Sequence, residues 1–236
     1  MRRQLAWAAL LLLLVACGSD DGLTVFAAAS LTDVLERIEP NARFNFAGSD
    51  ELAEQIGQGA PADVYASADE VYARRLHADG LIEEPISFAT NRLVLIVPRD
   101  NPAGILSVFN LKRPRVRVVI GAEGVPVGDY ARRLLETLDA SAVLENVVSE
   151  ERDVKGVAGK VAFGEADAGF VYATDVGAVA EDVIAIELPA AAQPEITYTI
   201  AIVEGTDDAE AADGFIDSVR SMRGRRLLRE AGFGVP

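Results

Sequence analysis

The chain has 236 residues, of which 50% are hydrophobic, and its 37 acidic and 22 basic side chains give a formal net charge of −15. This length allows one large domain or two small ones with a substantial core. Such an acidic chain is poorly suited to bind nucleic acid or an anionic lipid surface. A single cysteine and a single histidine exclude an internal disulfide and a Cys/His metal site.

The first sixteen residues have the pattern of a secretory signal peptide. Arg2 and Arg3 precede an apolar run, residues 5–16, that is too short to span a bilayer. The run ends in LVAC, which resembles a bacterial lipobox, in which Cys17 is lipidated and becomes the new N-terminus. The alternative is an ordinary secretory signal that has a cysteine just past its cleavage site.

Residues 17–23 then form a short polar tether. Removal of the leader takes away Arg2 and Arg3 and changes the formal charge from −15 to −17. We therefore expect an extracytoplasmic protein that acyl chains hold at a cell membrane, either in a periplasm or on a Gram-positive cell surface.

From residue 23 onward, strand-like and helix-like segments alternate. This alternation predicts an α/β fold with parallel strands. In chain order the predicted segments are strand 23–28, helix 31–38, strand 42–49, helix 50–59, strand 62–69, helix 70–80, strand 91–98, strand 116–122, helix 125–138, strand 145–151, helix 153–166, strand 168–175, strand 196–205 and helix 209–233.

The two longest apolar strands, 91–98 and 196–203, divide the chain into thirds. We expect them to be the two crossings between a pair of lobes. Lobe 1 would combine residues 24–89 with 201–236, and lobe 2 would hold residues 90–200. The almost continuous aliphatic run 91–98 is typical of a strand that is covered on both faces. The cleft between two such lobes is the expected ligand site.

The sequence has no pattern that favours catalysis. The single histidine, His77, lies near a predicted helix C-terminus, where a solvated or capping role is expected. The G-x-S-x-G, G-x-x-x-x-G-K and G-x-G-x-x-G motifs are all missing from the sequence. Carboxylates are abundant, but on so acidic a chain they are expected at the solvated surface. A secreted enzyme that uses paired carboxylates in the cleft is the alternative from another class.

Several strand-to-helix junctions consist of small or donor residues. Ser30 and Ser49 stand at the first two predicted helix starts, Val127 at the third and Val154 at the fourth. A helix N-terminus offers unpaired N–H groups and the positive end of a dipole, and so can bind an anion. Taken singly, each serine is more typical of an N-cap and each valine of a packing residue.

Six segments occur in order along the chain: VFAAASLTD, FAGSDELAEQI, GAPADVYASAD, GVPVGDYA, DVKGVAGKVAFGEADAGFVYATD and AGFG. Together they resemble the periplasmic molybdate-binding proteins of molybdate ABC transporters, over essentially the whole chain from Thr24 onward. The resemblance implies a two-lobed, type II periplasmic binding protein fold, in which each lobe is a mixed, mainly parallel sheet flanked by helices. It implies molybdate or tungstate as the ligand, an ABC permease as the partner, a monomer, and no cofactor. A receptor for another oxyanion, such as sulfate, is the alternative within this class.

The resemblance also implies which residues bind the oxyanion. By motif position they are the hydroxyls of Ser30 and Ser49, the backbone N–H groups of Val127 and Val154, and the hydroxyl of Tyr172. These groups would contact the oxygens of the anion and not the metal. Without the other motifs, Tyr172 would be taken for a buried aromatic residue of a core strand.

The sequence departs from the family pattern at two positions. Val127 is bulkier than the alanine that is common among relatives, although its N–H would still be available. Asp50 follows Ser49 where a hydroxyl residue is common, and we expect its carboxylate to face solvent and interact with the helix dipole. A site of uncharged donors would reject an oxyanion that carries a proton, because that O–H would find no acceptor.

Overall fold

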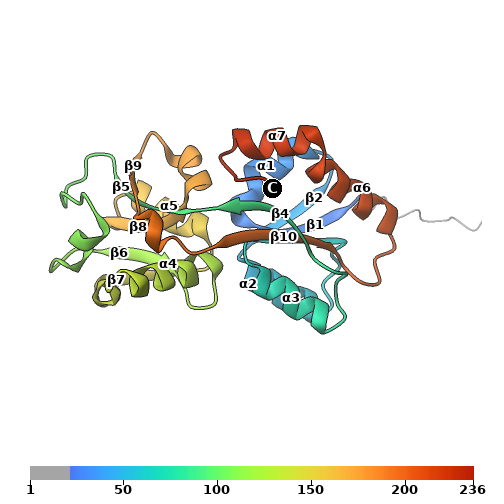
Figure 1. The fold of residues 1–236 in the computed structure, drawn as a ribbon, viewed down its shortest axis with the longest axis horizontal. Helices are drawn as coiled ribbons and strands as arrows, with labels where there is room; N and C mark the ends of the chain where they lie inside the picture. Colours follow the sequence, from blue (N-terminus) through green and yellow to red (C-terminus); the bar gives the residue numbers. More distant parts are fainter. Residues whose placement is uncertain (1–21) are drawn as a thin grey trace, which may run out of the picture.

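The computed structural model describes residues 22–236, so the predicted signal peptide, Cys17 and most of the tether lie outside the described residues. Two lobes lie side by side along the long axis of the molecule (Figure 1). Each lobe has a sheet of five strands with helices packed against it, which confirms the predicted two-lobed α/β fold. Among the described residues, no helix is both long and apolar enough to cross a membrane.

The first lobe contains the N-terminal and C-terminal parts of the described chain. Its sheet has the order β2-β1-β3-β10-β4, with β1 parallel to β2 and β3, and β10 antiparallel to β3 and β4. Its elements are β1 (Thr24–Ala28), the 3₁₀ turn η1 (Ala29–Leu31), α1 (Thr32–Ile38), β2 (Arg43–Ala47), α2 (Ser49–Gly57), β3 (Val64–Ser67), α3 (Glu70–Ala78), β4 (Ile86–Asn91), β10 (Ile196–Ile202), α6 (Ala209–Arg220) and α7 (Met222–Glu230).

The second lobe has the same kind of sheet, in the order β7-β6-β8-β5-β9. Here β6 is parallel to β7 and β8, and β5 is antiparallel to β8 and β9. Its elements are β5 (Leu93–Pro98), η2 (Val108–Lys112), β6 (Val118–Gly121), α4 (Pro126–Thr137), η3 (Ser141–Asn146), β7 (Val147–Glu151), α5 (Val154–Ala162), β8 (Ala168–Tyr172), η4 (Ala173–Val179), β9 (Val183–Glu187) and η5 (Ala190–Ala192).

Both sheets are mixed, as expected, but parallel pairs do not dominate them, because each described sheet has two parallel and two antiparallel pairings. Every residue of β5 is buried, which agrees with the prediction from its aliphatic run. The sheet of the first lobe is covered on both faces, by α1, α6 and α7 on one face and by α2 and α3 on the other (Figure 1). The latter pair has its own apolar cluster, which includes Leu52, Ile56 and Leu76.

The chain crosses between the lobes at two places that differ in part from the expected ones. The first crossing is at Arg92, since β4 pairs within the first sheet and β5 within the second. All of β10 pairs with β3 and β4, so residues 196–200 belong to the first sheet and not to the predicted lobe 2. The second crossing therefore precedes Ile196. The strands β4 and β9 were not predicted.

The single predicted helix 209–233 is two helices, and the break is at Ser221. The hydroxyl of Ser221 accepts a hydrogen bond from the N–H of Gly224 at 3.0 Å and so caps α7. A serine hydroxyl that bonds to a nearby backbone group competes with the continuous helix. Gly224 also lies so close to α6 that a β-carbon there would be 2.2 Å from the carbonyl oxygen of Val219.

Candidate functional site

The carboxyl ends of β1 and β2 in the first lobe, and of β6, β7 and β8 in the second, meet between the lobes. This is the edge where ligands of open α/β sheets bind, because the loops and helix starts that follow parallel strands gather there. A small cavity of about 20 Å³ lies at this place. Its lining comes from both lobes, so it is closed only when the lobes are together.

All five residues that the resemblance assigned to the oxyanion line this one cavity. They are separated by up to 142 positions in the sequence, from Ser30 to Tyr172. The full lining is Ala28, Ala29, Ser30, Ala47, Gly48, Ser49, Ala68, Val125, Pro126, Val127, Asp153, Val154 and Tyr172. The small side chains around the two serines leave the backbone open to close approach by a ligand.

Ser49 is the first residue of α2, and its hydroxyl does not cap that helix. The N-cap is Gly48, without a side-chain hydrogen bond. The Oγ of Ser49 instead accepts the N–H of Ala68 at 3.0 Å, while the carbonyl of Ser49 accepts the hydroxyl of Tyr65 at 2.7 Å. Because Oγ already receives a proton from a backbone donor, the hydroxyl proton of Ser49 is free to point into the cavity.

Ser30 lies in the turn η1 and not at the start of α1, which begins at Thr32. Its Oγ lies 2.9 Å from the hydroxyl oxygen of Tyr198, on β10. The simpler reading of this serine as an N-cap is therefore wrong, since its hydroxyl has a tertiary partner and no capping bond. Sequence reasoning missed Tyr198, because a tyrosine on an apolar strand gives no signal of a partner 168 residues away.

Tyr172 ends β8 and has a polar atom for which the described residues supply no partner. Its side chain is 2% exposed, and its hydroxyl oxygen is buried without a hydrogen bond in residues 22–236. Burial raises the pKa of Tyr172 well above its usual value, and the neighbouring Tyr198 and Tyr130 add to the shift. The phenol therefore keeps its proton and remains a donor. A buried unpaired hydroxyl costs free energy and marks a place where a ligand can complete the structure.

Two helix starts of the second lobe complete the lining. In α4, Pro126 is the first residue and has no N–H, so Val127 supplies the first amide proton of this helix. In α5, the carboxylate of Asp153 accepts the N–H of Gly156 at 2.9 Å, and the N–H of Val154 lies two residues earlier, at the helix start. The positive ends of both helix dipoles lie at the cavity.

The described lining of the cavity carries little charge. Asp153 is the one acidic or basic residue in its described lining, and its carboxylate is engaged as the cap of α5. Neither Arg152 nor Lys155 is part of that lining. Attraction for an anion must therefore come from hydroxyl and amide donors, whose hydrogen bonds to a charged acceptor are stronger than neutral ones.

The expectation that Asp50 faces solvent is wrong in part. Asp50 does not line the cavity, but its Oδ1 atom is buried, and the residue lies in a groove between α2 and α3 beside Tyr72 and Arg75. Burial raises the pKa of Asp50, and the N–H groups of Asp50 and Glu51 partly offset this. The helix start α2 thus stabilises this carboxylate, as the dipole argument predicted.

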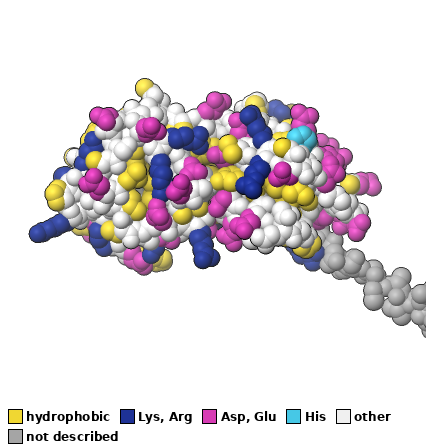
Figure 2. Space-filling view, turned by 90° about the horizontal axis from the view of Figure 1, so that it is seen from below, with side chains coloured by type: hydrophobic (Ala, Val, Ile, Leu, Met, Phe, Trp, Pro, Cys, Tyr) yellow, Lys and Arg dark blue, Asp and Glu magenta, His cyan; other side chains and the backbone are white. Residues whose placement is uncertain are grey.

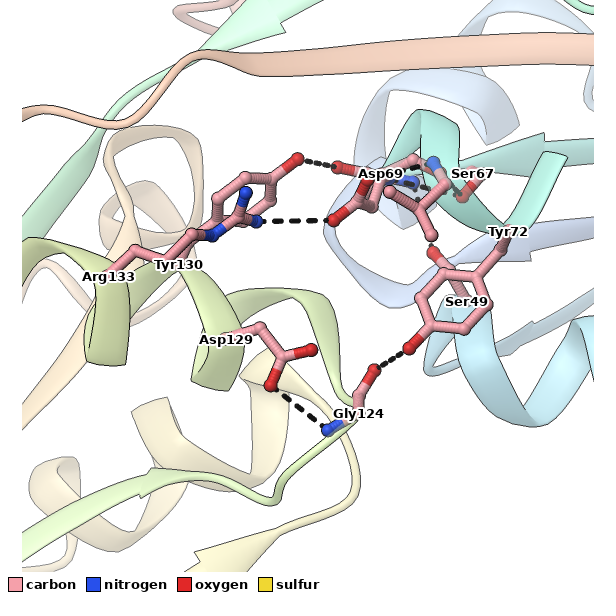
Figure 3. A network of polar contacts seen from close by, with 10 residues as sticks. Ser49, Ser67, Asp69, Tyr72, Gly124, Asp129, Tyr130 and Arg133 are labelled. Carbon is pink, nitrogen blue, oxygen red and sulfur yellow. Dashed lines mark hydrogen bonds and ion pairs between the residues drawn. The ribbon is translucent and has the colours of Figure 1, made fainter. Parts of the chain in front are cut away.

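Contacts between the lobes flank the cavity (Figure 3). The hydroxyl of Tyr72, on α3, donates to the carbonyl of Gly124, in the loop before α4. The guanidinium of Arg133, on α4, lies 3.5 Å from the carboxylate of Asp69 and 4.4 Å from the ring centre of Tyr130. Within the second lobe, the N–H of Gly124 donates to Asp129 at 3.0 Å and so orders the loop that Tyr72 contacts. The contacts of Tyr72 with Gly124 and of Arg133 with Asp69 join the lobes in a closed arrangement.

Larger hollows are also lined by residues of both lobes, and one of them shares Ser30 with this cavity. One, of about 440 Å³, is lined by residues such as Asp69 and Arg133, and another, of about 390 Å³, by residues such as Asp33, Lys155 and Asp175. Neither collects the predicted donors as the small cavity does. Among the described residues, no group of three or more His, Cys, Asp or Glu side chains is arranged to hold a metal ion.

The family model for bacterial extracellular solute-binding proteins matches residues 23–234 of this chain. The chain belongs to this family. It is 39% identical to the molybdate-binding protein ModA of Mycobacterium tuberculosis over 94% of this chain and 93% of that protein. It is 29% identical to the protein of the same name from Escherichia coli over 92% of this chain and 91% of that protein. The family resemblance that the motifs predicted is thereby confirmed.

Solved structures agree with the fold of this solute-binding protein. The periplasmic molybdate-binding protein of Azotobacter vinelandii matches with a TM-score of 0.80 and 22% identity, over 91% of this chain and 99% of that one. The sulfate-binding protein SubI of Mycobacterium tuberculosis matches with a TM-score of 0.74 and 18% identity, over 90% of this chain and 86% of that one. The relatives are solute-binding transport proteins and not enzymes, as the sequence analysis expected.

Proposed function

We propose that this protein captures molybdate or tungstate in the cavity between its lobes and delivers the oxyanion to an ABC permease. The observation that supports the proposal most strongly is the convergence of Ser30, Ser49 and Tyr172 with the N–H groups of Val127 and Val154. The relatives named for molybdate binding add to this support. The ligand would meet donors from both lobes, so binding would favour the closed arrangement.

The magnitudes are sufficient for tight binding. A hydrogen bond to a charged group contributes roughly 1.5–3 kcal/mol net, so five would supply on the order of 10 kcal/mol. This corresponds to dissociation constants between the micromolar and nanomolar ranges. The negative charge of the whole protein acts from farther away, where salt screens it beyond about 8–10 Å. Local donors therefore outweigh the repulsion.

Calorimetric titration of the ligand-free protein tests the ligand. We expect sub-micromolar binding of molybdate and tungstate and much weaker binding of sulfate and phosphate. The variants Ser30→Ala and Ser49→Ala should each weaken molybdate binding by about 10- to 100-fold, since each removes a charge-assisted hydrogen bond. Ser141→Ala, at an exposed serine of the second lobe, is the control and should bind as the parent does. Tight binding of sulfate instead of molybdate would support the alternative receptor.

We also propose that the protein is a lipoprotein anchored through Cys17, outside the cytoplasm, and acts as a monomer. The lipobox-like LVAC supports the anchor. A Bacillus subtilis relative, 31% identical over 89% of this chain, is named a putative ABC transporter substrate-binding lipoprotein. Expression of the full chain with Cys17→Ser should move the protein from the membrane fraction to the soluble extracytoplasmic fraction. Retention of that variant at the membrane would contradict the anchor.

A further inference from the structure

A short network of hydrogen-bonded polar side chains leads away from the cavity behind Ser30. The Oγ of Ser30 lies 2.9 Å from the hydroxyl of Tyr198. The side-chain amide of Asn91, at the end of β4, donates to that same hydroxyl at 3.3 Å and to the hydroxyl of Thr174 at 2.9 Å. Ser30, Asn91 and Tyr198 belong to the first lobe and Thr174 to the second, so this network lies where the lobes join.

The backbone determines which way the amide of Asn91 faces. The N–H of Arg92 donates to Oδ1 of Asn91 at 2.9 Å. A backbone N–H can only donate, so the atom opposite it must be the amide oxygen. The NH₂ group of Asn91 is thereby directed to Tyr198 and Thr174, and it can act there only as a donor.

The directions of the protons on Tyr198 and Ser30 follow from this orientation of Asn91. The hydroxyl oxygen of Tyr198 accepts from Asn91. Burial raises the pKa of Tyr198 well above its usual value, so this phenol keeps its own proton. Ser30 is the remaining oxygen within hydrogen-bond distance among the described residues, so Tyr198 donates to it. The Oγ of Ser30 is then an acceptor on the Tyr198 side, and its proton is left for the cavity.

The hydroxyl of Ser49 also accepts on the protein side and is left to donate into the cavity, for a separate reason. Its Oγ accepts the N–H of Ala68 at 3.0 Å, which is again a group that can only donate. Each serine therefore accepts from the protein and presents a proton to the cavity. The helix starts of the second lobe add amide donors, and the unpaired hydroxyl of Tyr172 can donate as well.

We propose that Asn91 and Tyr198 are positioning residues that hold the Ser30 hydroxyl as a donor and so make the site selective for oxyanions without a proton. This inference rests on the proposed function. An anion oxygen that bears no hydrogen can accept from Ser30. An O–H of hydrogen phosphate that faced Ser30 would meet a second proton there and would lose its hydrogen bond to water.

A double-mutant cycle on molybdate affinity tests whether Tyr198 acts through Ser30. Tyr198→Phe removes the hydroxyl and keeps the ring, which packs against Phe88, Tyr172 and Phe233. We expect Tyr198→Phe to weaken molybdate binding by about tenfold. In a Ser30→Ala background the same change should have almost no further effect. Tyr130→Phe, another buried tyrosine whose hydroxyl lies 3.4 Å from the carbonyl of Ala68, is the control and should have the same effect in both backgrounds.

The selectivity is measured by the concentration of phosphate, at about pH 8, that displaces molybdate. In Tyr198→Phe the Oγ of Ser30 is free to accept from the ligand, so the preference for molybdate over hydrogen phosphate should fall by about tenfold. Equal losses for both anions, or phosphate that displaces molybdate from neither protein, would overturn the selectivity. Independent effects of Tyr198→Phe and Ser30→Ala would overturn the coupling. A parent protein that does not bind molybdate would instead contradict the proposed function.

Discussion

The hydrogen-bond partners of individual hydroxyls determine what each hydroxyl can offer a ligand in this cavity, and these partners differ. The hydroxyl of Ser30 is paired with that of Tyr198, the hydroxyl of Ser49 accepts the N–H of Ala68, and the hydroxyl of Tyr172 has no partner within the described residues. A buried hydroxyl with a partner stabilises the fold, whereas one without a partner costs free energy until a ligand supplies an acceptor. The three residues therefore differ in what their removal does to stability.

Tyr172→Phe separates affinity from stability. The change removes the unpaired hydroxyl, so molybdate affinity should fall by about tenfold or more, while the ligand-free protein keeps its free energy of unfolding or gains slightly. Tyr65→Phe is the comparison, because it leaves the buried carbonyl of Ser49 without its 2.7 Å partner. That variant should lose about 1–3 kcal/mol of stability in chemical denaturation. A large stability loss in Tyr172→Phe would contradict the unpaired state of this hydroxyl.

Asp175, in η4, is a buried carboxyl that makes stability depend on pH. Burial raises its pKa from an ordinary 3.8 to about 8, against the opposing effect of Lys155, while Asp33 and Asp153 raise it further. Below the ordinary value both the folded and the unfolded chain hold the proton. Between that value and about pH 8 only the folded chain holds it, so this residue's contribution to stability falls as pH rises.

Asp175→Asn should remove this decrease of stability with rising pH. The free energy of unfolding of the parent should fall more steeply with pH than that of the variant, by up to about 1.4 kcal/mol per pH unit between about pH 4 and 8. At about pH 4 the two proteins should be similarly stable, which is the internal control. Denaturant unfolding across this pH range measures both, and parallel curves would show that Asp175 is not buried as described.

At the scale of elements, the start of α2 is a place where the two lobes approach each other closely. Gly48 has φ −62° and ψ 141°, which any residue adopts without strain. A β-carbon there would nevertheless lie 2.6 Å from the carbonyl oxygen of Arg152, in the other lobe, and 2.6 Å from Oδ1 of Asp50. Glycine is thus required at position 48 so that the lobes can close, and not because the backbone conformation demands it.

Gly48→Ala should therefore impair binding more than folding. We expect molybdate affinity to fall by at least about tenfold, because the closed arrangement is required to bring the second lobe's donors to the anion. The thermal midpoint of the ligand-free protein should change little. Gly57→Ala, in the same helix, is the matched control, since a β-carbon there meets nothing within 4 Å. Unchanged binding by Gly48→Ala would show that the ligand-bound lobes do not approach this closely.

At the scale of the whole molecule, an acidic protein is proposed to bind a dianion through local, uncharged donors. Asp and Glu side chains are scattered over both lobes on the face shown in Figure 2, with Lys and Arg side chains among them. Charges spread in this way act over distances at which salt screens them, whereas hydrogen bonds in a closed cavity are screened much less. Binding should thus be insensitive to salt.

Raising sodium chloride from about 0.05 M to about 0.5 M should change the dissociation constant for molybdate by less than about threefold, and any change should be toward tighter binding. The reason is that salt weakens the repulsion by the negative surface and leaves the donor contacts intact. A steep loss of affinity with salt would indicate attraction by surface Lys and Arg side chains instead. The same titration with Arg133→Ala, whose guanidinium bridges the lobes beside the cavity, reports whether that cation contributes.

The alternation of strands and helices, the burial of β5 and the motif residues that line one cavity could all be predicted from the sequence. They are local patterns, or motifs that a family resemblance places together. The break between α6 and α7 was not predicted, because it depends on the competition of Ser221 with an otherwise helical pattern. The edge strand β9 was missed, since its mostly exposed or half-exposed residues lack a buried face.

Only the tertiary structure decided that β10 completes the first sheet, and that Asn91 and Tyr198 stand behind Ser30. Side-chain periodicity records which face of an element is buried, but it does not record which distant residue lies against it. Strand pairing and hydroxyl partners join positions more than a hundred residues apart. They arise only when distant segments of the first lobe pack together, and so no local pattern in the sequence reports them.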